Sequence, residues 1–458
     1  MGSDPTSVDR TTGFEETSFW ARQYGPYAGG PPLRGNIDVD VAVVGAGFTG
    51  LNTARELCDS NPGSSVVVLE SAVVGFGASG RNGGFSMKLF GLEPELTVAR
   101  WGRERVVAAH RFMERAVAFV RELVEKHELD SDYRHTGLVR VSYNDRQLRR
   151  LHKTLELHRR LGIDGDMSFL TADELRRQFH TPHYQGGLFE RETGIMNPCK
   201  HVRELKRLAE AAGARVLEQS PVVRIRHEGG RIRLETPEGC VRAEKLVLAT
   251  NAYSRGVPDL PRIRSRQAPL WTYQVVTEPL SESLWESIGW SEQQSFEDNR
   301  QLIHYFRRTV DGRITMGGGD AGTPFGSGMD HDSSPRIWRH LEEHLRWIFP
   351  QLRDVGFAYR WGGPVSVNLE MTPEIGFIGD ERVIYATGYI GHGLSASHLA
   401  GRLIADLLAG EQTELTDFWI VNRKAIPWPG EPFSYLGKAG VRLALRAWDR
   451  WEERGLRR

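Results

Sequence analysis

The hydrophobic pattern of the first seventy residues predicts a strand, a helix and a second strand. Residues 38–44, DVDVAVV, form an apolar and β-branched run that is typical of a buried parallel strand. Residues 48–60 carry apolar side chains at helical spacing, and residues 64–70, SSVVVLE, form a second apolar run. This order predicts an α/β unit with a parallel sheet.

The turn between the first strand and the helix reads GAGFTG and matches the pattern G-x-G-x-x-G. Gly45 permits a tight turn, Gly47 a close backbone approach to a pyrophosphate, and Gly50 close packing of helix on strand. Glu70 ends the second strand about 20 residues later, where an acid binds ribose. We predict a dinucleotide site; the alternative is a glycine-rich turn between packed elements. Its candidate ligands are Gly45, Gly47, Phe48, Thr49, Gly50, Glu70 and Ser71.

A second copy of the pattern, GFGASG at residues 75–80, is followed by RNGGFSMKLFG, which holds too many glycines to begin a helix. We therefore interpret it as irregular backbone near the cofactor, with an ordinary loop as the alternative. Gly75→Ala should then be mild, whereas valine at Gly83 or Gly84 should be damaging. The candidate ligands here are Ala78, Ser79, Arg81, Asn82, Gly83 and Gly84.

Two later segments continue the same pattern. An apolar strand at residues 246–249 precedes Thr250 and Asn251, and a strand at 383–386 precedes the turn GYIGHG. An amphipathic helix follows, with Ser395 or Ser397 as the expected N-cap and Gly410 as its stop. The positive end of this helix suits a reduced flavin, although simple packing on the sheet explains the helix equally well.

Composition narrows the function classes. The chain has 458 residues, with Lys+Arg 59 balanced by Asp+Glu 59, so it offers no attraction to nucleic acid or an anionic surface as a whole. Three widely spaced cysteines predict neither a disulfide framework nor a metal site. The N-terminal residues lack a signal peptide's pattern, and no apolar run spans a bilayer. We expect a cytoplasmic protein with a small-molecule partner.

The segments GAGFTG, VVVLE, GFGASGRNGG, TPEIGFIGD and ATGYIGHGLSASHLAGRLIADLL together resemble the FAD-dependent amine and amino-acid oxidoreductases of the D-amino-acid oxidase superfamily. The likeness is nearest to the gamma-glutamylputrescine oxidase-like branch. It implies that the glycine turn and Glu70 hold the ADP half of FAD. It further implies an adenine contact at Val223 and flavin contacts at Gly391, His392, Gly393 and Leu394. Thr250 and Asn251, in the polar turn after the strand at 246–249, are also candidate ligands.

The resemblance also implies the fold class: a Rossmann-like FAD-binding domain in discontinuous segments, with an inserted mixed-sheet substrate domain, α/β in type and α+β overall. We expect an N-terminal extension at 1–37, FAD-binding segments at 38–90, 194–254 and 374–410, substrate-domain segments at 91–193 and 255–373, and a tail at 411–458.

This sequence departs from sarcosine-oxidase-like members at two positions. Those members attach flavin through a cysteine, but residues 361–370 contain none, so we expect non-covalent FAD. They also carry a lysine over the flavin, and the best-matching residue here is Thr315. Reduction of oxygen by that route is therefore in question.

Residues 300–309, RQLIHYFRRT, predict a strand of the substrate domain. Alternation places His304, Phe306 and Arg308 on one face and Tyr305 and Arg307 on the other. Tyr305 and Arg307 are candidates to bind a substrate carboxylate, with a solvated sheet face as the alternative. The His392 ring either contacts the flavin or the residue acts through its backbone alone. We take His392, Tyr305, Arg307 and Thr315 as candidate catalytic residues.

The tail from Gly440 onward predicts a basic helix, with Arg442, Arg446 and Arg450 at i, i+4 spacing beside Trp448 and Trp451. It suits a membrane surface or a partner, but we favour a helix packed on its own protein.

The leading hypothesis is an oxidase that transfers a hydride from the carbon of a C–N bond to flavin, releases an imine that hydrolyses, and reduces oxygen to hydrogen peroxide. The alternatives are a dehydrogenase that passes electrons to a quinone or carrier, and a flavin-binding subunit without catalysis.

Overall fold

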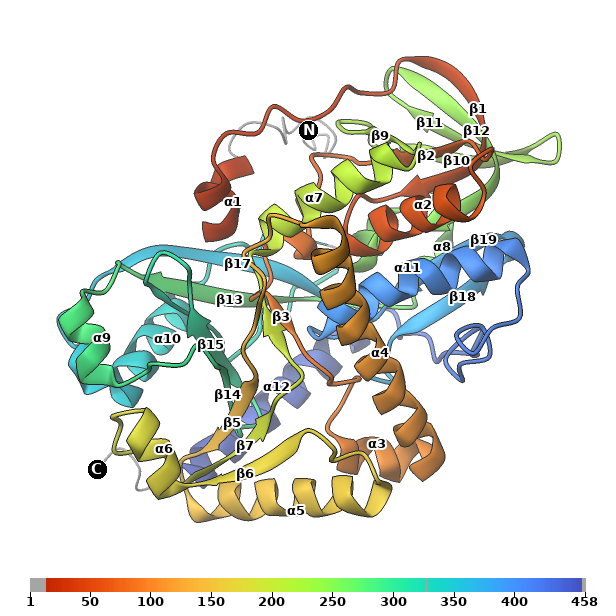
Figure 1. The fold of residues 1–458 in the computed structure, drawn as a ribbon. Helices are drawn as coiled ribbons and strands as arrows, with labels where there is room; N and C mark the ends of the chain where they lie inside the picture. Colours follow the sequence, from red (N-terminus) through yellow and green to blue (C-terminus); the bar gives the residue numbers. More distant parts are fainter. Residues whose placement is uncertain (1–13, 327, 455–458) are drawn as a thin grey trace.

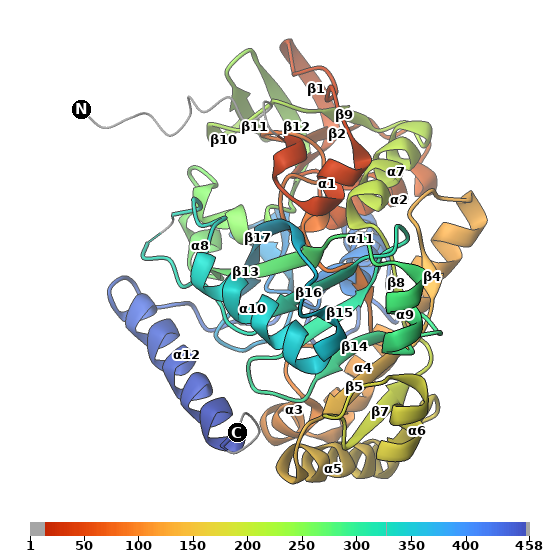
Figure 2. The same cartoon turned by 90° about the vertical axis from the view of Figure 1, so that its left-hand side faces the viewer.

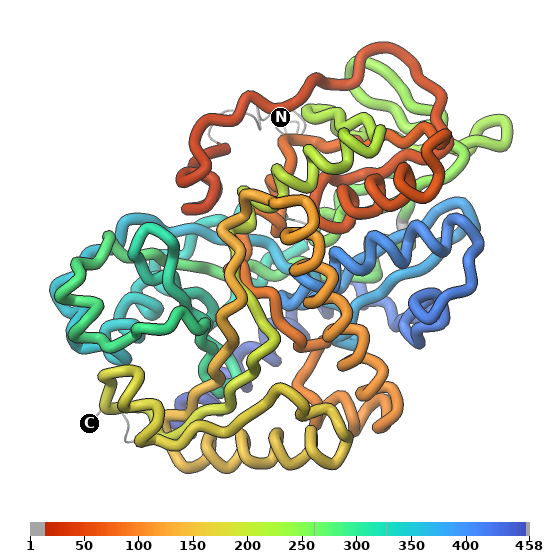
Figure 3. The backbone as a smooth tube through the Cα atoms, in the orientation of Figure 1, coloured from red at the N-terminus to blue at the C-terminus, as the bar shows by residue number. Residues whose placement is uncertain are grey.

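The computed structural model describes residues 14–326 and 328–454, in which two eight-stranded sheets form the centres of two lobes (Figure 1). The chain passes between the lobes more than once, as the tube in Figure 3 shows. The first sheet uses strands from residues 35–69, 215–248 and 374–387, and the second uses strands from 138–190 and 268–367. The predicted fold class is thus confirmed, whereas the domain boundaries stay a prediction.

The first sheet has a parallel centre in the order β19, β12, β1, β2, β9, with antiparallel strands at its margins. Its apolar strands are buried on both faces, as β2 shows with four consecutive buried residues. The parallel strands are β1 (Gly35–Val44), β2 (Val66–Leu69), β9 (Arg215–Leu217), β12 (Gly239–Leu248) and β19 (Asp380–Thr387), and the others are β10 (Arg224–Glu228), β11 (Arg231–Thr236) and β18 (Glu374–Ile378).

Four helices share a buried core with this sheet: α2 (Phe48–Ser60), α4 (Arg103–His127), α7 (Pro198–Ala211) and α11 (Gly393–Ala409). The predicted stop of α11 is confirmed, because Gly410 is its left-handed C-cap. The predicted N-caps are wrong. The helix begins at Gly393, and the Ser395 hydroxyl lies 2.9 Å from that of Ser86 instead.

The second sheet runs in the order β17, β13, β16, β15, β14, β5, β7, β6 and is antiparallel except between β14 and β5. One face forms an apolar core with α10 (Pro335–Ile348), and the other faces the first lobe. The strands are β5 (Leu138–Ser142), β6 (Met167–Thr171), β7 (Gly186–Glu190), β13 (Ala268–Thr277), β14 (Ser295–Asp298), β15 (His304–Arg308), β16 (Ile314–Gly318) and β17 (Phe357–Val367).

A small sheet of β3, β8 and β4 also forms, and α12 lies on the outside of the molecule near α10 (Figure 2). None of the helices within the described ranges is long and apolar enough to cross a bilayer. The remaining elements are η1 (Phe14–Glu16), α1 (Phe19–Tyr24), η2 (Ala78–Gly80), β3 (Phe85–Ser86), α3 (Pro94–Trp101), β4 (Arg134–His135), α5 (Asp145–Leu161), α6 (Ala172–Gln178), β8 (Gly194–Ile195), η3 (Asn251–Gly256), α8 (Pro261–Arg264), α9 (Glu282–Ile288), η4 (Pro350–Leu352) and α12 (Phe433–Glu452).

A buried carboxylate ties the N-terminal segment to the first sheet. Glu218 follows β9, has no exposed surface, and accepts hydrogen bonds from the Val74 N–H at 2.5 Å and the Tyr27 hydroxyl at 2.8 Å. The Lys206 ammonium lies 3.0 Å from the same carboxylate. Part of the predicted N-terminal extension, residues 14–37, thus packs on the lobe; residues 1–13 lie outside the described residues.

We predict that Glu218→Ala lowers the free energy of unfolding by about 3–5 kcal/mol, because it removes the buried carboxylate that balances the charge of the Lys206 ammonium. Urea denaturation followed by fluorescence measures the change. Glu238→Ala is the control, since Glu238 pairs with Arg34 at 3.4 Å and its side chain is 57% exposed. Equal effects of the two substitutions would contradict the assignment.

Candidate functional site

The first glycine turn joins β1 to α2 and has the backbone that the pattern requires. Gly45 has a φ of +107°, and a Cβ there would lie 2.7 Å from the Ala249 carbonyl oxygen. A Cβ at Gly50 would overlap the Gly45 carbonyl oxygen, and one at Gly47 would lie 2.8 Å from Ser79 Oγ. The turn therefore forms a cradle at the N-terminus of α2, where backbone N–H groups favour an anion.

Glu70 lies beside this cradle, at the carboxyl end of β2. Its carboxylate accepts hydrogen bonds from the Ala46 N–H at 2.9 Å, the Ala72 N–H at 3.0 Å and the Ser71 hydroxyl at 3.2 Å. Burial raises the pKa of Glu70, while the backbone donors lower it. The acid is thus held in one orientation, in the place from which it binds a ribose in dinucleotide folds.

The second glycine pattern repeats the packing of the first without its helix. Gly75 has a φ of +78°, and a Cβ at Gly80 would overlap the Gly75 carbonyl oxygen, as one at Gly50 overlaps Gly45. The segment continues as η2, a single 3₁₀ turn. A Cβ at Gly75 would overlap Val202 Cγ1, so the expectation that Gly75→Ala is mild is wrong.

Arg81 and Asn82 maintain the shape of the segment that follows. Arg81 is buried, donates to the Phe76 carbonyl at 2.8 Å, and pairs with Asp332 at 3.2 Å. The Asn82 amide donates to the Ala78 carbonyl at 3.0 Å and accepts from the Gly84 N–H at 2.8 Å. These side chains were expected to donate to the cofactor; in the structure they bond to the protein itself.

Gly83 and Gly84 press against β15 of the second lobe. A Cβ at Gly83 would lie 2.9 Å from the Tyr305 ring. Gly84 has a φ of +75°, and a Cβ there would overlap the Met196 carbonyl oxygen and lie 2.7 Å from Arg307 Nη2. The two lobes thus meet where glycine leaves no room for a side chain.

Arg307 has different partners from those expected. Its guanidinium donates to the carbonyls of Gly83 at 2.7 Å, Met196 at 2.6 Å and Arg308 at 3.3 Å, and it lies over the Trp20 ring. Burial lowers its pKa to about 9. Because the N–H groups of Arg307 already donate to main-chain carbonyls, this guanidinium links the two lobes and is not free to bind a substrate carboxylate.

Tyr305 and Thr315 lie on the sheet face toward the first lobe, as the alternation predicts for Tyr305. The Tyr305 ring packs edge-on against Phe85 with centroids 5.5 Å apart, and burial raises its pKa. Thr315 pairs across the strands with Arg307, and its buried hydroxyl has no hydrogen-bond partner within the described chain. Phe306, on the opposite face, belongs to the apolar core.

The pairing register gathers a row of polar residues on this same face. Arg140 opposes Glu297, Glu297 opposes Tyr305, Tyr305 opposes Gly317, and Gly317 opposes Gln274. Opposed residues on neighbouring strands share one face of a sheet. The Gln274 amide donates to the Arg81 carbonyl at 2.7 Å, so one end of the row contacts the second glycine segment.

Glu297 and Arg140 form a buried pair within this row. The Arg140 guanidinium lies 3.2 Å from the Glu297 carboxylate and 2.9 Å from that of Glu93. Burial raises the pKa of Glu297 to about 7, although Arg140 opposes the shift. Sequence reasoning missed both residues. The sequence contains a signal that could have found them, because each is a charged residue in a short strand whose residues are all buried.

His392 approaches the row from the first lobe. Glu93 and Arg140 are close enough to influence its pKa, which burial lowers to about 4. The imidazole is therefore neutral at pH 7. Its Nδ1 atom is buried and has no hydrogen-bond partner within residues 14–326 and 328–454, while its backbone N–H donates to the Tyr389 carbonyl at 3.0 Å.

Two further predicted cofactor ligands, Phe48 and Thr49, lie in the first turn of α2 beside the cradle. The Thr49 hydroxyl lies 2.9 Å from that of Tyr389, and the Phe48 N–H donates to Ser79 Oγ at 3.0 Å. Asn251 has a φ of +42° and a buried Oδ1 atom without a partner in the described chain. Of the rest, Leu394 is buried, Thr250 bonds to Ser254, Gly391 has a φ of +96°, Gly393 packs on Tyr389, Ala78 begins η2, and Val223 is exposed.

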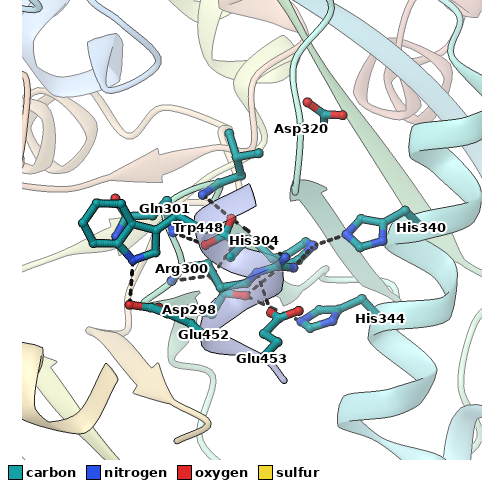
Figure 4. A network of polar contacts seen from close by, with 12 residues as sticks. Asp298, Arg300, Gln301, His304, Asp320, His340, His344, Trp448, Glu452 and Glu453 are labelled. Atoms are coloured by element: carbon teal, nitrogen blue, oxygen red, sulfur yellow. Dashed lines mark hydrogen bonds and ion pairs between the residues drawn. The ribbon is translucent and has the colours of Figure 1, made fainter. Parts of the chain in front are cut away.

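A separate polar cluster lies behind the row, on the far face of β14 and β15 (Figure 4). Asp298 Oδ2 lies 2.7 Å from His304 Nδ1 and 3.5 Å from His344 Nε2, a set able to ligate a metal ion where we predicted no metal site. The Arg300 guanidinium lies 3.2 Å from His304 Nδ1. A cation in this position opposes the binding of another, so we interpret the cluster as a hydrogen-bond network.

The cradle, the fixed acid and two helix N-termini fit FAD, because they match its pyrophosphate, its ribose and the pyrimidine edge of its ring. Together with an inserted mixed sheet whose polar face meets this lobe, they define a flavin-dependent oxidoreductase. A protein-family profile described as DAO, FAD dependent oxidoreductase, matches residues 40–407. The chain belongs to this family and binds FAD, so the predicted enzyme class, family and cofactor are confirmed.

The sequence is 34% identical to the gamma-glutamylputrescine oxidoreductase of Escherichia coli over 94% of this chain and 98% of that protein. Among solved structures, the L-proline dehydrogenase of P. horikoshii has a TM-score of 0.71 at 21% identity, covering 89% of this chain and 99% of that one. The glycine oxidase of Geobacillus kaustophilus has a TM-score of 0.69 at 20% identity, covering 84% and 99%. These structural likenesses show a shared fold.

We predict that Gly84→Ala sharply lowers the flavin content of the purified protein. The substitution adds about 1–2 kcal/mol of backbone strain at a positive φ and an overlap with the Met196 carbonyl, which displaces the segment. The ratio of absorbance at flavin and protein bands, with circular dichroism as a folding check, measures the effect. Gly256→Ala is the control, since nothing lies within 4 Å of its Cβ. Full flavin content in Gly84→Ala would refute the assignment.

Proposed function

We propose that this protein oxidises the C–N bond of a small amine or amino acid to an imine that hydrolyses, with oxygen as the acceptor. The observation that carries the proposal is the row of buried Arg140, Glu297 and Gln274 with half-buried Tyr305, which faces the flavin-binding lobe. FAD, when bound, accepts the hydride. Its relatives by sequence include oxidoreductases named for gamma-glutamylputrescine, glycine and sarcosine.

Within this row, Glu297 takes a proton from the substrate. An amine must lose its ammonium proton before it releases a hydride readily, and a carboxylate with a pKa of about 7 accepts that proton near neutral pH. Arg140 holds the carboxylate in place by its hydrogen bond. Tyr305 and the neutral His392 flank the substrate and exclude water from it.

The surroundings of the row favour a substrate that carries charges away from the reacting nitrogen. Charged groups of both signs line the neighbouring pocket, which includes Lys88, Glu93, Arg140 and Glu190. A γ-glutamyl amine has an ammonium and a carboxylate at its far end, which these groups can pair by exchanging their present partners, Asp166 for Lys88 and Glu93 for Arg140. We therefore propose a primary amine with a zwitterionic far end as the substrate class.

We assign Arg307 a positioning role and Thr315 a place beside the flavin. Arg307 holds Gly83 and Met196, so its removal disturbs the cofactor before it disturbs the substrate. The flavin is held without a covalent bond: Cys58, Cys199 and Cys240 are buried in α2, α7 and β12 of the first lobe, and residues 361–370 contain no cysteine.

A dehydrogenase that passes electrons to a quinone or carrier is the second candidate. Thr315 in place of the lysine and the fold shared with an L-proline dehydrogenase favour it. A flavin-binding subunit without catalysis is a third, which an unchanged anaerobic flavin spectrum across a panel of amines would favour.

We predict that kcat/KM falls about tenfold per pH unit below about pH 7, because Glu297 becomes protonated and cannot accept a proton. Glu297→Gln should lower kcat/KM by about 10²–10⁴-fold near pH 7 and move the limb up to the pKa of the free substrate amine, about 10, because only the deprotonated amine can then react. In Glu93→Gln the limb should persist at lower pH, since the charge of Glu93 raises the pKa of Glu297. An unaltered limb in Glu297→Gln would exclude Glu297 as the proton acceptor.

We predict that the substrate-reduced enzyme is reoxidised by dissolved oxygen faster than turnover and releases hydrogen peroxide. Anaerobic reduction with a γ-glutamyl amine, followed by stopped-flow mixing with oxygen or a quinone analogue, measures both rates. Slow reoxidation by oxygen with fast reoxidation by quinone would replace the oxidase with the dehydrogenase.

A further inference from the structure

Side chains from outside the second glycine segment hold its backbone in place. The carbonyl of every residue from 80 to 83 accepts at least one hydrogen bond from such a side chain. The donors are Ser18 to Gly80 at 2.8 Å, Gln274 and Trp361 to Arg81 at 2.7 and 2.9 Å, Trp20 to Asn82 at 2.8 Å, and Arg307 to Gly83 at 2.7 Å. Since residues 81–84 lie in no helix or strand, their conformation depends on these donors.

Two of these donors belong to the N-terminal segment. Ser18 is the N-cap of α1, and Trp20 lies in the first turn of that helix. The Ser18 hydroxyl donates to the Gly80 carbonyl and also accepts from the Ala21 N–H at 3.1 Å, so one group both begins α1 and contacts the glycine segment. Ser18 is 0% and Trp20 is 1% exposed, so water has no access to replace either bond.

Helix α1 lies between the two lobes. It packs on α7 of the first lobe and contacts β17 of the second, and Figure 1 and Figure 2 both show it beside α7. The Arg307 guanidinium also lies 4.5 Å from the centroid of the Trp20 ring. One apolar cluster includes side chains of η1, α1 and both lobes: Phe14, Phe19, Trp20, Ala21, Val73, Cys199, Val276 and Trp361. The position of Ser18 and Trp20 is therefore fixed by both lobes.

The bond from Trp20 orients the peptide group between Asn82 and Gly83. The C=O and N–H of a trans peptide point in opposite directions, so a carbonyl turned toward α1 turns the Gly83 N–H away from α1. Gly83 is buried, and its N–H donates to no acceptor within residues 14–326 and 328–454. A buried N–H group without a partner is rare in proteins, and this one therefore indicates a ligand acceptor on the side of the segment away from α1.

We propose that Ser18 and Trp20 are positioning residues for the flavin and act through the second glycine segment. The proposal rests on the expectation that this segment lines the flavin, which Gly84→Ala tests separately. FAD binds only the fraction of molecules whose segment has the competent conformation, so a segment released from its donors binds FAD more weakly. The family profile matches residues 40–407, so α1 adds a part of the cofactor site from outside the matched region.

Replacement of the indole tests the role of Trp20. Trp20→Phe keeps a ring in the apolar cluster but leaves the Asn82 carbonyl without its donor, and we expect the FAD dissociation constant to rise about tenfold. Dilution of the holoenzyme, with released flavin measured by fluorescence, gives this constant. Phe14→Leu is the matched control, since it reduces packing in the same cluster but removes no hydrogen bond, and it should lower the melting temperature without weakening FAD binding. An equal rise in both variants, or no rise in Trp20→Phe, would overturn the proposal.

A second pair of variants separates the two bonds of Ser18. Ser18→Ala removes the N-cap of α1 together with the donor to Gly80, whereas Ser281→Ala removes the N-cap of α9, a helix of similar length, and no bond to the glycine segment. We expect weaker FAD binding in Ser18→Ala and unchanged binding in Ser281→Ala. Equal binding in the two variants would exclude Ser18 as a positioning residue. Both experiments measure bound flavin without substrate, so their outcome does not depend on which compound the enzyme oxidises or which acceptor it uses.

Discussion

The contact between Arg307 and the glycine segment at residues 81–84 is the constraint on which the rest of the site depends. A guanidinium that is almost fully buried donates to the carbonyls of Gly83 and Met196, and burial lowers its pKa. Because Gly83 and Gly84 lack side chains, the second glycine segment lies directly on β15. This contact brings the flavin-binding lobe against one particular face of the second sheet.

That face is polar because the opposite face forms the core. The residues Val139, Phe296, Phe306, Met316 and Val275 oppose one another across five strands and pack with α10. Successive residues of a strand alternate between faces, so the neighbouring row is turned toward the flavin lobe. Glu297 therefore owes its burial and its raised pKa to the lobe that covers it, and the same burial enables it to exchange a proton near pH 7.

Three other buried carboxylates also have ion-pair or hydrogen-bond partners within the protein. Glu218 ties the N-terminal segment to the first sheet, Asp298 lies within a histidine network, and Asp320 receives two arginines of α12. The last pairing has a consequence for the surface. By using the charged side of α12 for the protein, it leaves the apolar side outward.

The sequence alone determined the parts of the site that local geometry specifies. Gly45, Gly50 and Glu70 were predictable because the turn, the close packing and the acid all lie within one strand, helix and strand unit. The alternation of Tyr305 and Phe306 was predictable for the same reason. Only the tertiary structure decided which distant residues meet: Arg140 and Glu297 are 157 positions apart, and their pairing depends on a register that periodicity does not encode. The tertiary structure also decided that Arg307 donates to main-chain carbonyls and that the charged face of α12 packs on the protein. The reason is that partners such as Asp320 become neighbours only when the chain has folded.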